Sequence, residues 1–455
     1  MNYEQSVAFL LSLGKELASP RQASVQKFDL ENIRVLAGAL GSPHRAIPCA
    51  HVAGTNGKGS TAAMLESILR ASGLSTGLFT SPHLQRINER IAFDGQPISD
   101  GEFAAGFSRV HEKIESLLAN GELAAHPTFF ECVTAMAFEA FARRRVNFVV
   151  YEVGMGGRLD STNIVSPEVA VITQIGLDHE DFLGHSIAQI ASEKAGIIKP
   201  GAWVVVAAEH PEAREVIARR AEVVGARVVE IDGTWTIEKA SSQDGCYLAE
   251  ASETLTGTRW RLEIPLRGRV QIRNGLAAAT AGILLGQRGF PVSNEAIERG
   301  IREARWPGRL ERLAQNPTIL LDGAHNPAAA RELASFLKDE LAGRRIWLIF
   351  GTVRDKSVDE IAGLLFPQVH KVFFTEPQNS RAISAELLAE MTSHLAQQYE
   401  VLPHPQEAAA RALSAAAAED VILIAGSLYL VGYLREYCLG RFSAERSGRE
   451  MRTSS

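Results

Sequence analysis

The sequence predicts an α/β protein made of two domains. Short apolar runs rich in Val, Ile and Phe alternate with segments of helical periodicity, which is typical of a mostly parallel sheet covered by helices. A stretch with the alternation of antiparallel strands follows, and after a segment that contains Pro307 and Gly308 the α/β rhythm starts again. A length of 455 residues suffices for two large domains or about three ordinary ones.

The first domain is expected over residues 1–302. The run at 47–52 predicts a buried strand, and a Gly-rich turn and the helix-like STAAMLESILRASG follow it. Residues 235–266 have short polar connections and some alternation, which indicates a small antiparallel annex before the helical pattern RNGLAAATAGILLGQRG. Four further strand candidates share the apolar character of the first: 76–80, 148–153, 169–174 and 203–207.

The second domain is expected to be smaller, with a Rossmann-like α/β fold over residues 310–440. Residues 303–309 (EARWPGR) interrupt the pattern and predict a linker between the domains. The tail at 441–455 is polar and basic, and we expect it to be flexible. The strand candidates of this domain are 318–321, 346–350, 371–374 and 421–424.

Composition excludes several classes of protein. Hydrophobic residues make up 46% of the chain and charged residues 22%, and the net charge of −6 argues against a nucleic-acid-binding protein. No apolar run approaches the roughly 18 residues that span a bilayer, and the acidic N-terminus predicts no secretion signal. Four scattered cysteines without a CxxC pair indicate a reducing setting. We therefore expect a cytoplasmic protein with no membrane or nucleic-acid partner.

The most informative motif is HVAGTNGKGST at residues 51–61, between a predicted strand and a predicted helix. Its glycines let backbone amides approach a polyphosphate, and the helix dipole favours the anion. Lys58 can contact the β- and γ-phosphates of ATP, and the Ser60 hydroxyl can reach Mg²⁺. A glycine separates the two, which departs from the usual GxxxxGK[ST], and a turn that only lets the helix pack on the sheet is the alternative. The other candidate ATP-binding residues of this motif are Gly54, Thr55, Asn56, Gly57 and Gly59.

A P-loop needs a carboxylate to hold its metal, usually at the end of a neighbouring strand. Glu152 lies at the end of an apolar run, and Asp178 and His179 follow another. All three would therefore lie at the edge of a parallel sheet where ligands bind. Ser81 follows a third strand and is a further candidate oxygen ligand. The alternatives are a strand-end glutamate in a salt bridge and a structural histidine.

Seven motifs occur in one order along nearly the whole chain: AGTNGKGST, FTSPHL, YEVGMGGRLDSTNIV, ITQIGLDH, SEKAGIIKPG, WPGRLE and LDGAHNP. Together they resemble the folylpolyglutamate synthase/dihydrofolate synthase family of the Mur ligase superfamily, and the sequence is similar to its bacterial members. The resemblance implies an N-terminal P-loop ATPase-like domain and an ATP-dependent acid–amino-acid ligase.

The resemblance also implies roles for particular residues around two Mg²⁺ ions. Lys58 and Ser60 match positions that bind ATP phosphates and Mg²⁺, Ser81 and Glu152 match ligands of one ion, and His179 matches a ligand of the second. Lys194 matches a lysine that is carbamylated in relatives, which would convert a cation into a carboxylate-like ligand. A solvated helix lysine is the alternative for Lys194.

Four further positions match nucleotide or phosphate contacts of the family. Asn274, Arg309 and Asp322 match residues that contact the nucleotide, and His325 matches a residue near the phosphates. Without the motifs, Asn274 would more often be a helix cap and Asp322 a turn residue.

The substrate pocket is the least specific part of the resemblance. Asp160 matches a position near the pterin, and Arg158 precedes it in the GGRLDSTN form that resembles the bifunctional enzymes. Thr128 and Phe129 resemble part of the pteroyl pocket, as do residues 30–34. A helix face and core aromatic residues are the alternatives for these segments.

We therefore expect a monomeric ligase that joins L-glutamate to a folate or dihydropteroate carboxylate through an acyl phosphate. A P-loop switch protein is a different class, but the sequence has no NKxD-like base-reading motif. A Mur-type ligase with a UDP-linked substrate would need an additional N-terminal domain, for which the 46 or so residues before the first strand are too few.

Overall fold

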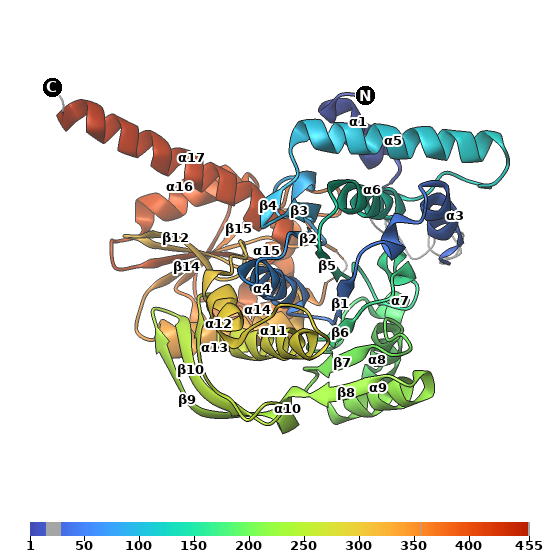
Figure 1. The fold of residues 1–455 in the computed structure, drawn as a ribbon. Coiled ribbons are helices and arrows are strands. Elements are labelled where there is room, and N and C mark those ends of the chain that lie inside the picture. The colour runs from blue at the N-terminus through green and yellow to red at the C-terminus, as the bar shows by residue number, and fades with distance from the viewer. Residues whose placement is uncertain (15–28, 355, 454–455) are drawn as a thin grey trace. The chain divides into compact units, whose positions relative to one another are not determined.

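The computed structural model describes residues 1–14, 29–354 and 356–453. The chain forms two compact units, each of which is described by itself (Figure 1). Unit 1 comprises Met1–Ser241, Leu248–Pro265 and Gln271–Arg305, and unit 2 comprises Ser242–Tyr247, Leu266–Val270 and Trp306–Ser455. The main division falls between Arg305 and Trp306, inside the segment expected to be a linker. The ranges 1–302, 303–309 and 310–440 remain predictions.

Unit 1 contains a large, mostly parallel sheet, as the sequence predicted. Its strand order is β4-β3-β2-β5-β1-β6-β7-β8; the pairs from β2 to β8 are parallel, and β3 and β4 add an antiparallel edge. The central strands are buried because helices cover them. The strands are β1 (Cys49–Ala53), β2 (Thr76–Phe79), β3 (Ile91–Phe93), β4 (Gln96–Pro97), β5 (Phe148–Glu152), β6 (Val169–Ile172), β7 (Trp203–Val206) and β8 (Arg227–Glu230).

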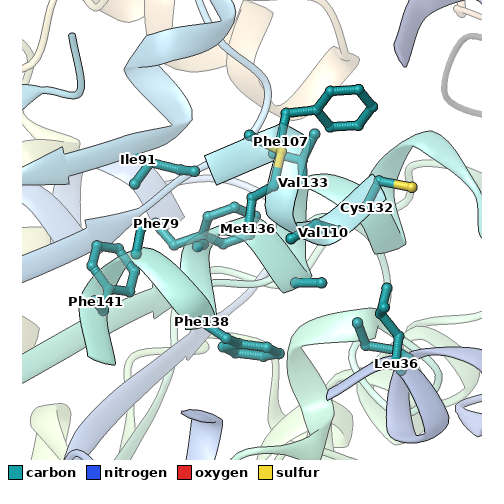
Figure 2. Close-up of a cluster of buried hydrophobic side chains, with 14 of the residues drawn as sticks. Leu36, Phe79, Ile91, Phe107, Val110, Cys132, Val133, Met136, Phe138 and Phe141 are labelled. Carbon is teal, nitrogen blue, oxygen red and sulfur yellow. The ribbon is translucent and has the colours of Figure 1, made fainter. Parts of the chain in front are cut away.

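The principal apolar core of unit 1 lies where helices pack on this sheet. Figure 2 shows aromatic and aliphatic side chains from several of these elements meeting in it, among them Phe79, Phe107 and Phe138. The contributing helices include α1 (Tyr3–Ser12), α3 (Glu31–Ala39), α5 (Asp100–Ala119) and α6 (Phe129–Arg144). Capping boxes begin α5 at Ser99 and α6 at Thr128, which fixes where each helix starts.

Other helices of unit 1 support the remaining sheet. Helix α4 (Lys58–Ala71) contacts β1, β2 and β5 and packs against α12 (Asn294–Glu303). Helices α8 (Ile187–Ala195) and α9 (Pro211–Val224) contribute to a second apolar cluster near β6 and β7. The other helices of the unit are α7 (Glu180–Leu183), α10 (Ile231–Thr234), α11 (Val270–Gln287) and the short η1 (Pro43–Arg45), η2 (Ile87–Arg90) and η3 (Ser161–Ile164).

A small separate sheet confirms the expected antiparallel annex. Its order is β11-β10-β9, formed by β9 (Trp235–Gln243), β10 (Cys246–Glu253) and β11 (Arg259–Ile264). Strand β11 alternates strictly between exposed and buried residues, which is the pattern of a sheet with one solvated face.

Unit 2 is a second α/β fold with the strand order β12-β13-β17-β14-β15-β16. Strand β12 pairs antiparallel with β13, and the other pairs are parallel. Its strands are β12 (Glu311–Gln315), β13 (Thr318–Leu321), β14 (Ile346–Phe350), β15 (Lys371–Phe374), β16 (Tyr399–Val401) and β17 (Val421–Ala425). Its helices are α13 (Pro327–Glu340), α14 (Val358–Leu365), η4 (Phe366–Gln368), α15 (Ala385–Thr392), η5 (Ser393–Leu395), α16 (Pro405–Ala415) and α17 (Leu428–Thr453).

The C-terminal segment differs from the expectation. The sequence predicted a flexible tail over 441–455; α17 continues to Thr453, and the flexibility of this segment remains a prediction. The segment is polar, but it is also rich in Arg, Glu and Ala, which favour helix. In the part of the chain that is described, no helix combines the length and apolar character that a membrane span requires.

Candidate active site

The predicted phosphate and metal residues of unit 1 follow four strands that are neighbours in the sheet. The order β2-β5-β1-β6 is parallel throughout, so the carboxyl ends of these strands lie along one edge. Ser81 follows β2, Glu152 ends β5, the Gly-rich loop follows β1, and His179 follows β6. Parallel sheets bind ligands at this edge, and the sequence-based grouping of these residues is reproduced in the fold.

The Gly-rich loop has a backbone that only glycine can adopt comfortably at Gly57. This residue has φ +87° and directly precedes helix α4, which starts at Lys58. A Cβ at Gly57 would lie 2.4 Å from Asn274 Oδ1, so the loop and α11 approach each other closely. Asn274 lies inside α11 and donates to Gln271 Oε1 at 2.9 Å, so its alternative role as a helix cap is wrong.

Hydrogen bonds attach the loop to the segment after β6. The Thr55 N–H donates to the Gln174 carbonyl at 2.7 Å, and the Thr55 hydroxyl donates to the Gly176 carbonyl at 2.9 Å. Asn56 Nδ2 donates to Gln174 Oε1 at 3.1 Å, and Thr173 Oγ1 donates to the Asn56 carbonyl at 2.7 Å. Thr173 and Gln174 were missed by sequence reasoning, although polar residues directly after an apolar strand were a usable signal.

Lys58 is the first residue of α4, and its side chain is hydrogen-bonded to the loop that precedes it. Its Nζ donates to the carbonyls of Gly54 at 3.1 Å and Thr55 at 3.2 Å. Ser60 is buried in the first turn of α4. The ammonium group and the N-terminus of a 14-residue helix therefore occupy one region, which favours a polyphosphate.

Ser81 and Glu152 meet at the ends of β2 and β5. The Ser81 N–H donates to Glu152 Oε2 at 3.2 Å, and both residues are buried. Ser81 Oγ is a buried oxygen with no hydrogen-bond partner among the described residues. A buried carboxylate beside an unsatisfied hydroxyl fits a hard cation such as Mg²⁺, which prefers oxygen ligands.

His179 has an unusual backbone for its residue type. Its φ is +52°, in the left-handed region that non-glycine residues adopt at some cost. The Asp178 carboxylate accepts the His179 N–H at 2.9 Å, and its Oδ1 lies 4.0 Å from His179 Nε2. The imidazole of His179 is partly exposed, and the Asp178 carboxylate lies next to it.

Lys194 is buried, which excludes the alternative of a solvated helix lysine. Its Nζ donates to the Gly54 carbonyl at 2.8 Å, so α8 is joined to the Gly-rich loop. Burial, and after it the charge of Lys58, lowers the pKa of Lys194 from 10.5 to about 7. A lysine with this pKa is about half neutral amine at pH 7, and a neutral amine is the form that reacts with CO₂.

Asp160 organises the loop between β5 and η3. Its Oδ2 accepts the N–H groups of Gly154 and Met155, each at 3.0 Å. Its Oδ1 accepts the N–H of Thr162 at 3.0 Å and the hydroxyl of the same residue at 2.5 Å. The carboxylate is thus saturated by its own loop, and a folate contact by Asp160 stays a prediction.

Arg158 and the neighbouring glycine attach the same loop to α8. Arg158 donates to Glu193 Oε1 through Nε at 3.1 Å and through a terminal nitrogen at 2.8 Å, and its side chain is exposed. A Cβ at Gly157 would lie 2.7 Å from the Glu193 carbonyl and 3.0 Å from Lys194 Cα. Glycine is therefore required for the loop to approach Lys194 this closely.

Thr128 and Phe129 also have structural roles. The Thr128 hydroxyl caps α6 by accepting the Glu131 N–H at 3.2 Å. Phe129 is buried in the apolar core, and the Arg90 guanidinium lies 5.2 Å from the centre of its ring. Phe129 is therefore a core aromatic residue, as in the alternative interpretation, and Thr128 caps the helix. The folate contacts of both residues remain predictions.

The predicted nucleotide residues of unit 2 lie close together. Asp322 and His325 follow β13, and Arg309 precedes β12. Asp322 accepts two backbone N–H groups at 2.9 and 2.8 Å; burial raises its pKa, and the nearby Arg309 opposes this rise. A Cβ on Gly323 would lie 2.1 Å from the Arg309 guanidinium, so glycine makes room for that side chain. His325 donates from Nδ1 to the Gly323 carbonyl at 2.7 Å. Arg309, Asp322 and His325 are thus neighbours within their unit.

Unit 1 also contains a basic cavity of about 410 Å³. Arg34, His44, Arg45, Asn163 and Lys199 contribute to its lining. Burial lowers the pKa values of both His44 and Lys199, as do neighbouring arginines. Arg34 falls in the segment expected to contact a pteroyl group, whereas the other four residues lie outside that segment and were missed.

Two family models match most of the chain. The Mur ligase middle domain matches residues 52–282, and the Mur ligase, glutamate ligase domain matches residues 308–428. Together with the Gly-rich loop at the edge of a parallel sheet, these matches define the protein as a Mur ligase.

Sequence relatives narrow the class. The chain is 36% identical over 442 residues to a folylpolyglutamate synthase of Lacticaseibacillus casei, covering 97% of this chain and 99% of that protein. It is 35% identical over 420 residues to a dihydrofolate synthase/folylpolyglutamate synthase of Bacillus subtilis, covering 90% and 94%. It spans about half the length of a probable bifunctional folylpolyglutamate synthase/dihydropteroate synthase of Halobacterium salinarum, with 36% identity over 442 residues, 96% of this chain and 51% of that protein.

Solved structures agree with the sequence relatives. A Mycobacterium tuberculosis folylpolyglutamate synthase complexed with ADP has a TM-score of 0.86 and 32% identity, covering 96% of this chain and 98% of that chain. An Escherichia coli enzyme in complex with DHPP and ADP has a TM-score of 0.83 and 31% identity, with the same coverage. The chain belongs to the folylpolyglutamate synthase/dihydrofolate synthase family, which confirms the resemblance seen in the motifs.

Proposed function

We propose that this protein is an ATP-dependent ligase that joins L-glutamate to the carboxylate of a folate or of dihydropteroate. The observation that carries the proposal is the Gly-rich loop after β1, with Lys58 on its carbonyls and the buried pair Ser81 and Glu152 beside it in the sheet order. Two relatives of known structure were solved with ADP, and one of them also with DHPP, which supports a nucleotide and a small-molecule substrate.

The reaction needs positioning more than covalent catalysis. A substrate carboxylate oxygen attacks the γ-phosphorus of ATP, and ADP leaves to give an acyl phosphate. The amine of L-glutamate then attacks the acyl carbon; the C–N bond forms, phosphate leaves, and the amine loses a proton. Lys58 and the amides at the start of α4 would stabilise the charge on the transferring phosphoryl oxygens.

The residues at the sheet edge fit a magnesium requirement. Ser60, Ser81 and Glu152 would hold one Mg²⁺, and His179 and a carbamylated Lys194 would hold a second. When bound, Mg²⁺ neutralises charge on the phosphates. The fit rests on the unsatisfied hydroxyl of Ser81 next to a buried carboxylate.

Nucleotide contacts are proposed in both units. In unit 1 they comprise the loop residues from Gly54 to Ser60 and Asn274, which is buried against Gly57. In unit 2, Arg309 and Asp322 would contact the nucleotide, and His325 would lie near its phosphates. The carboxylate of Asp322 suits ribose hydroxyls because it accepts hydrogen bonds.

A coupled ATPase assay with L-glutamate tests the proposal, with dihydropteroate and tetrahydrofolate offered separately. ADP release that requires both glutamate and a pteroate or folate, with a product heavier by one glutamyl residue in mass spectrometry, is the expected result. Activity with one acceptor only would assign one of the two reactions. Absence of activity with both acceptors, in a protein that still binds ATP, would instead favour a Mur-type ligase with another carboxylate substrate.

A further inference from the structure

A group of metal-ligating side chains lies at helix α5, apart from the Gly-rich loop. Within the part of the chain that the structure describes, His111, Glu115 and His126 form a single group of this kind, with ligand atoms all within 4.8 Å of one another. His111 and Glu115 are four residues apart on α5, so they share a face of that helix. His126 comes from the segment that precedes α6.

The two imidazoles present buried nitrogens without partners. His111 Nδ1 and His126 Nε2 are both inaccessible to solvent and have no hydrogen-bond partner among the described residues. Buried polar atoms are nearly always satisfied in proteins, so a pair of such nitrogens near one another needs an explanation. Glu115 Oε1 lies 3.9 Å from His111 Nδ1, which is too long for a hydrogen bond.

The hydrogen bond of His126 fixes which nitrogen carries the lone pair. Its Nδ1 lies 2.8 Å from the Pro127 carbonyl. A carbonyl only accepts, so Nδ1 carries the proton, and in the neutral ring Nε2 holds the free lone pair. A histidine that donates one N–H to a backbone carbonyl and directs the other nitrogen to a cation is the usual arrangement in metal sites.

Aromatic packing holds the two rings in place. The Phe9 ring lies 4.8 Å from the His111 ring and 5.6 Å from the His126 ring, measured between centres. Phe107 stacks on His111, with the ring centres 5.7 Å apart and the planes nearly parallel. Glu115 is exposed and can rotate, so a small movement would bring its oxygen to the nitrogens.

We propose that His111, Glu115 and His126 form a binding site for a divalent transition-metal cation such as Zn²⁺. Zinc bonds of about 2.0–2.1 Å place tetrahedral ligands roughly 3.4 Å apart, so the present distances need only modest closure. Two nitrogen ligands disfavour Mg²⁺, which prefers oxygen. Three protein ligands leave a fourth position for water, and the metal would join α5 to the segment before α6.

Zinc titration of the full-length, chelator-treated protein tests the site. Excess Mg²⁺ is kept in the buffer so that it occupies the oxygen-rich positions at the sheet edge. Zn²⁺ binding is measured by competition with a chromophoric chelator. We expect one Zn²⁺ equivalent that His126→Gln loses and that Glu115→Gln binds at least about tenfold more weakly. His210→Gln, which changes an exposed histidine of the same unit, should bind like wild type.

Two further readouts make the result decisive. Zinc should raise the Tm of the wild type but not of His126→Gln, and Co²⁺ should give the visible absorption of tetrahedral coordination only in the wild type and His210→Gln. Glu115 is exposed, so its variant decides the matter if His126→Gln fails to fold. Equal zinc stoichiometry and affinity in the wild type and Glu115→Gln, or no zinc binding by the wild type, would overturn the proposal and leave a bridging water as the partner of the two imidazoles.

Discussion

Lys194 should react with CO₂ at neutral pH, whereas an ordinary lysine would not. Its pKa is lowered from 10.5 to about 7, chiefly by burial and secondly by Lys58. At pH 7.5 the neutral amine is then about 75% of the population, against about 0.1% for a lysine with the ordinary pKa, a difference of roughly 700-fold. Attack on CO₂ replaces one N–H with a C–N bond and releases a proton, and the remaining N–H can keep the bond to the Gly54 carbonyl.

The assay is ¹³C NMR of protein equilibrated with ¹³CO₂ at fixed partial pressure. The neutral fraction of Lys194 rises from about 9% at pH 6 to about 91% at pH 8, and the reaction releases a proton, so the carbamate signal should rise at least about tenfold over this range. The N-terminal amine can also form a carbamate, so the Lys194 signal is identified as the one that is lost in Lys194→Met and kept in Lys239→Met, which alters an exposed lysine. A carbamate spectrum that is unchanged in Lys194→Met, or a Lys194 signal that is flat between pH 6 and 8, would refute the reasoning.

The lowered pKa of Lys194 also makes the free energy of unfolding depend on pH. Between about pH 7 and 10.5 the unfolded chain binds more protons at Lys194 than the folded protein does, so this residue makes stability rise with pH. Denaturant unfolding of wild type and Lys194→Met across that range should therefore show the wild type gaining relative to the variant as pH increases. If the difference in unfolding free energy between wild type and Lys194→Met were the same at every pH, Lys194 would be a solvated amine.

Three substitutions test the remaining site. Lys58→Ala should lower kcat at least about 100-fold without changing the circular dichroism spectrum, because the ammonium serves the phosphates and not the core; near-normal turnover would contradict the ATP assignment. Glu152→Gln should raise the Mg²⁺ concentration for half-maximal activity roughly tenfold, since an amide is a poorer ligand for a hard cation; an unaltered Mg²⁺ titration would remove Glu152 from the metal site. Asp160→Asn should lower the free energy of unfolding by roughly 1–3 kcal/mol, measured with urea, because an amide NH₂ group would face backbone donors; an unchanged midpoint would show that the loop does not depend on this carboxylate.

Local patterns predicted most of the fold. The strands 318–321, 346–350 and 371–374 agree with β13, β14 and β15 at both ends, because continuous apolar runs between turn residues identify buried parallel strands. The sequence could not predict the order β2-β5-β1-β6, which depends on how helices cross over the sheet. The helical continuation of α17 to Thr453 was not predicted, because the tail was assigned from polarity alone and polarity does not distinguish helix from coil.

Some positions of the candidate site could be predicted from the sequence and others could not, for a physical reason. Lys58, Glu152 and His179 follow apolar strands, so their place at the sheet edge could be inferred from neighbours in sequence. The burial of Lys194 could not, because it depends on contact with Gly54, which is 140 residues away in the chain. Likewise, the saturation of Asp160 by its own loop is visible only in the folded backbone.

The bond between Lys194 and Gly54 has a consequence for how the protein responds to its nucleotide. The chain segments around the Gly-rich loop, from Gly54 to Asn274, are brought together only when unit 1 is folded, so the proposed phosphate site exists only in the folded unit. A nucleotide that binds the folded state alone stabilises it by about 2.7 kcal/mol at 100 times its Kd. Resistance of unit 1 to proteolysis should therefore rise with the supply of ATP, so that the survival of the enzyme follows the energy state of its surroundings.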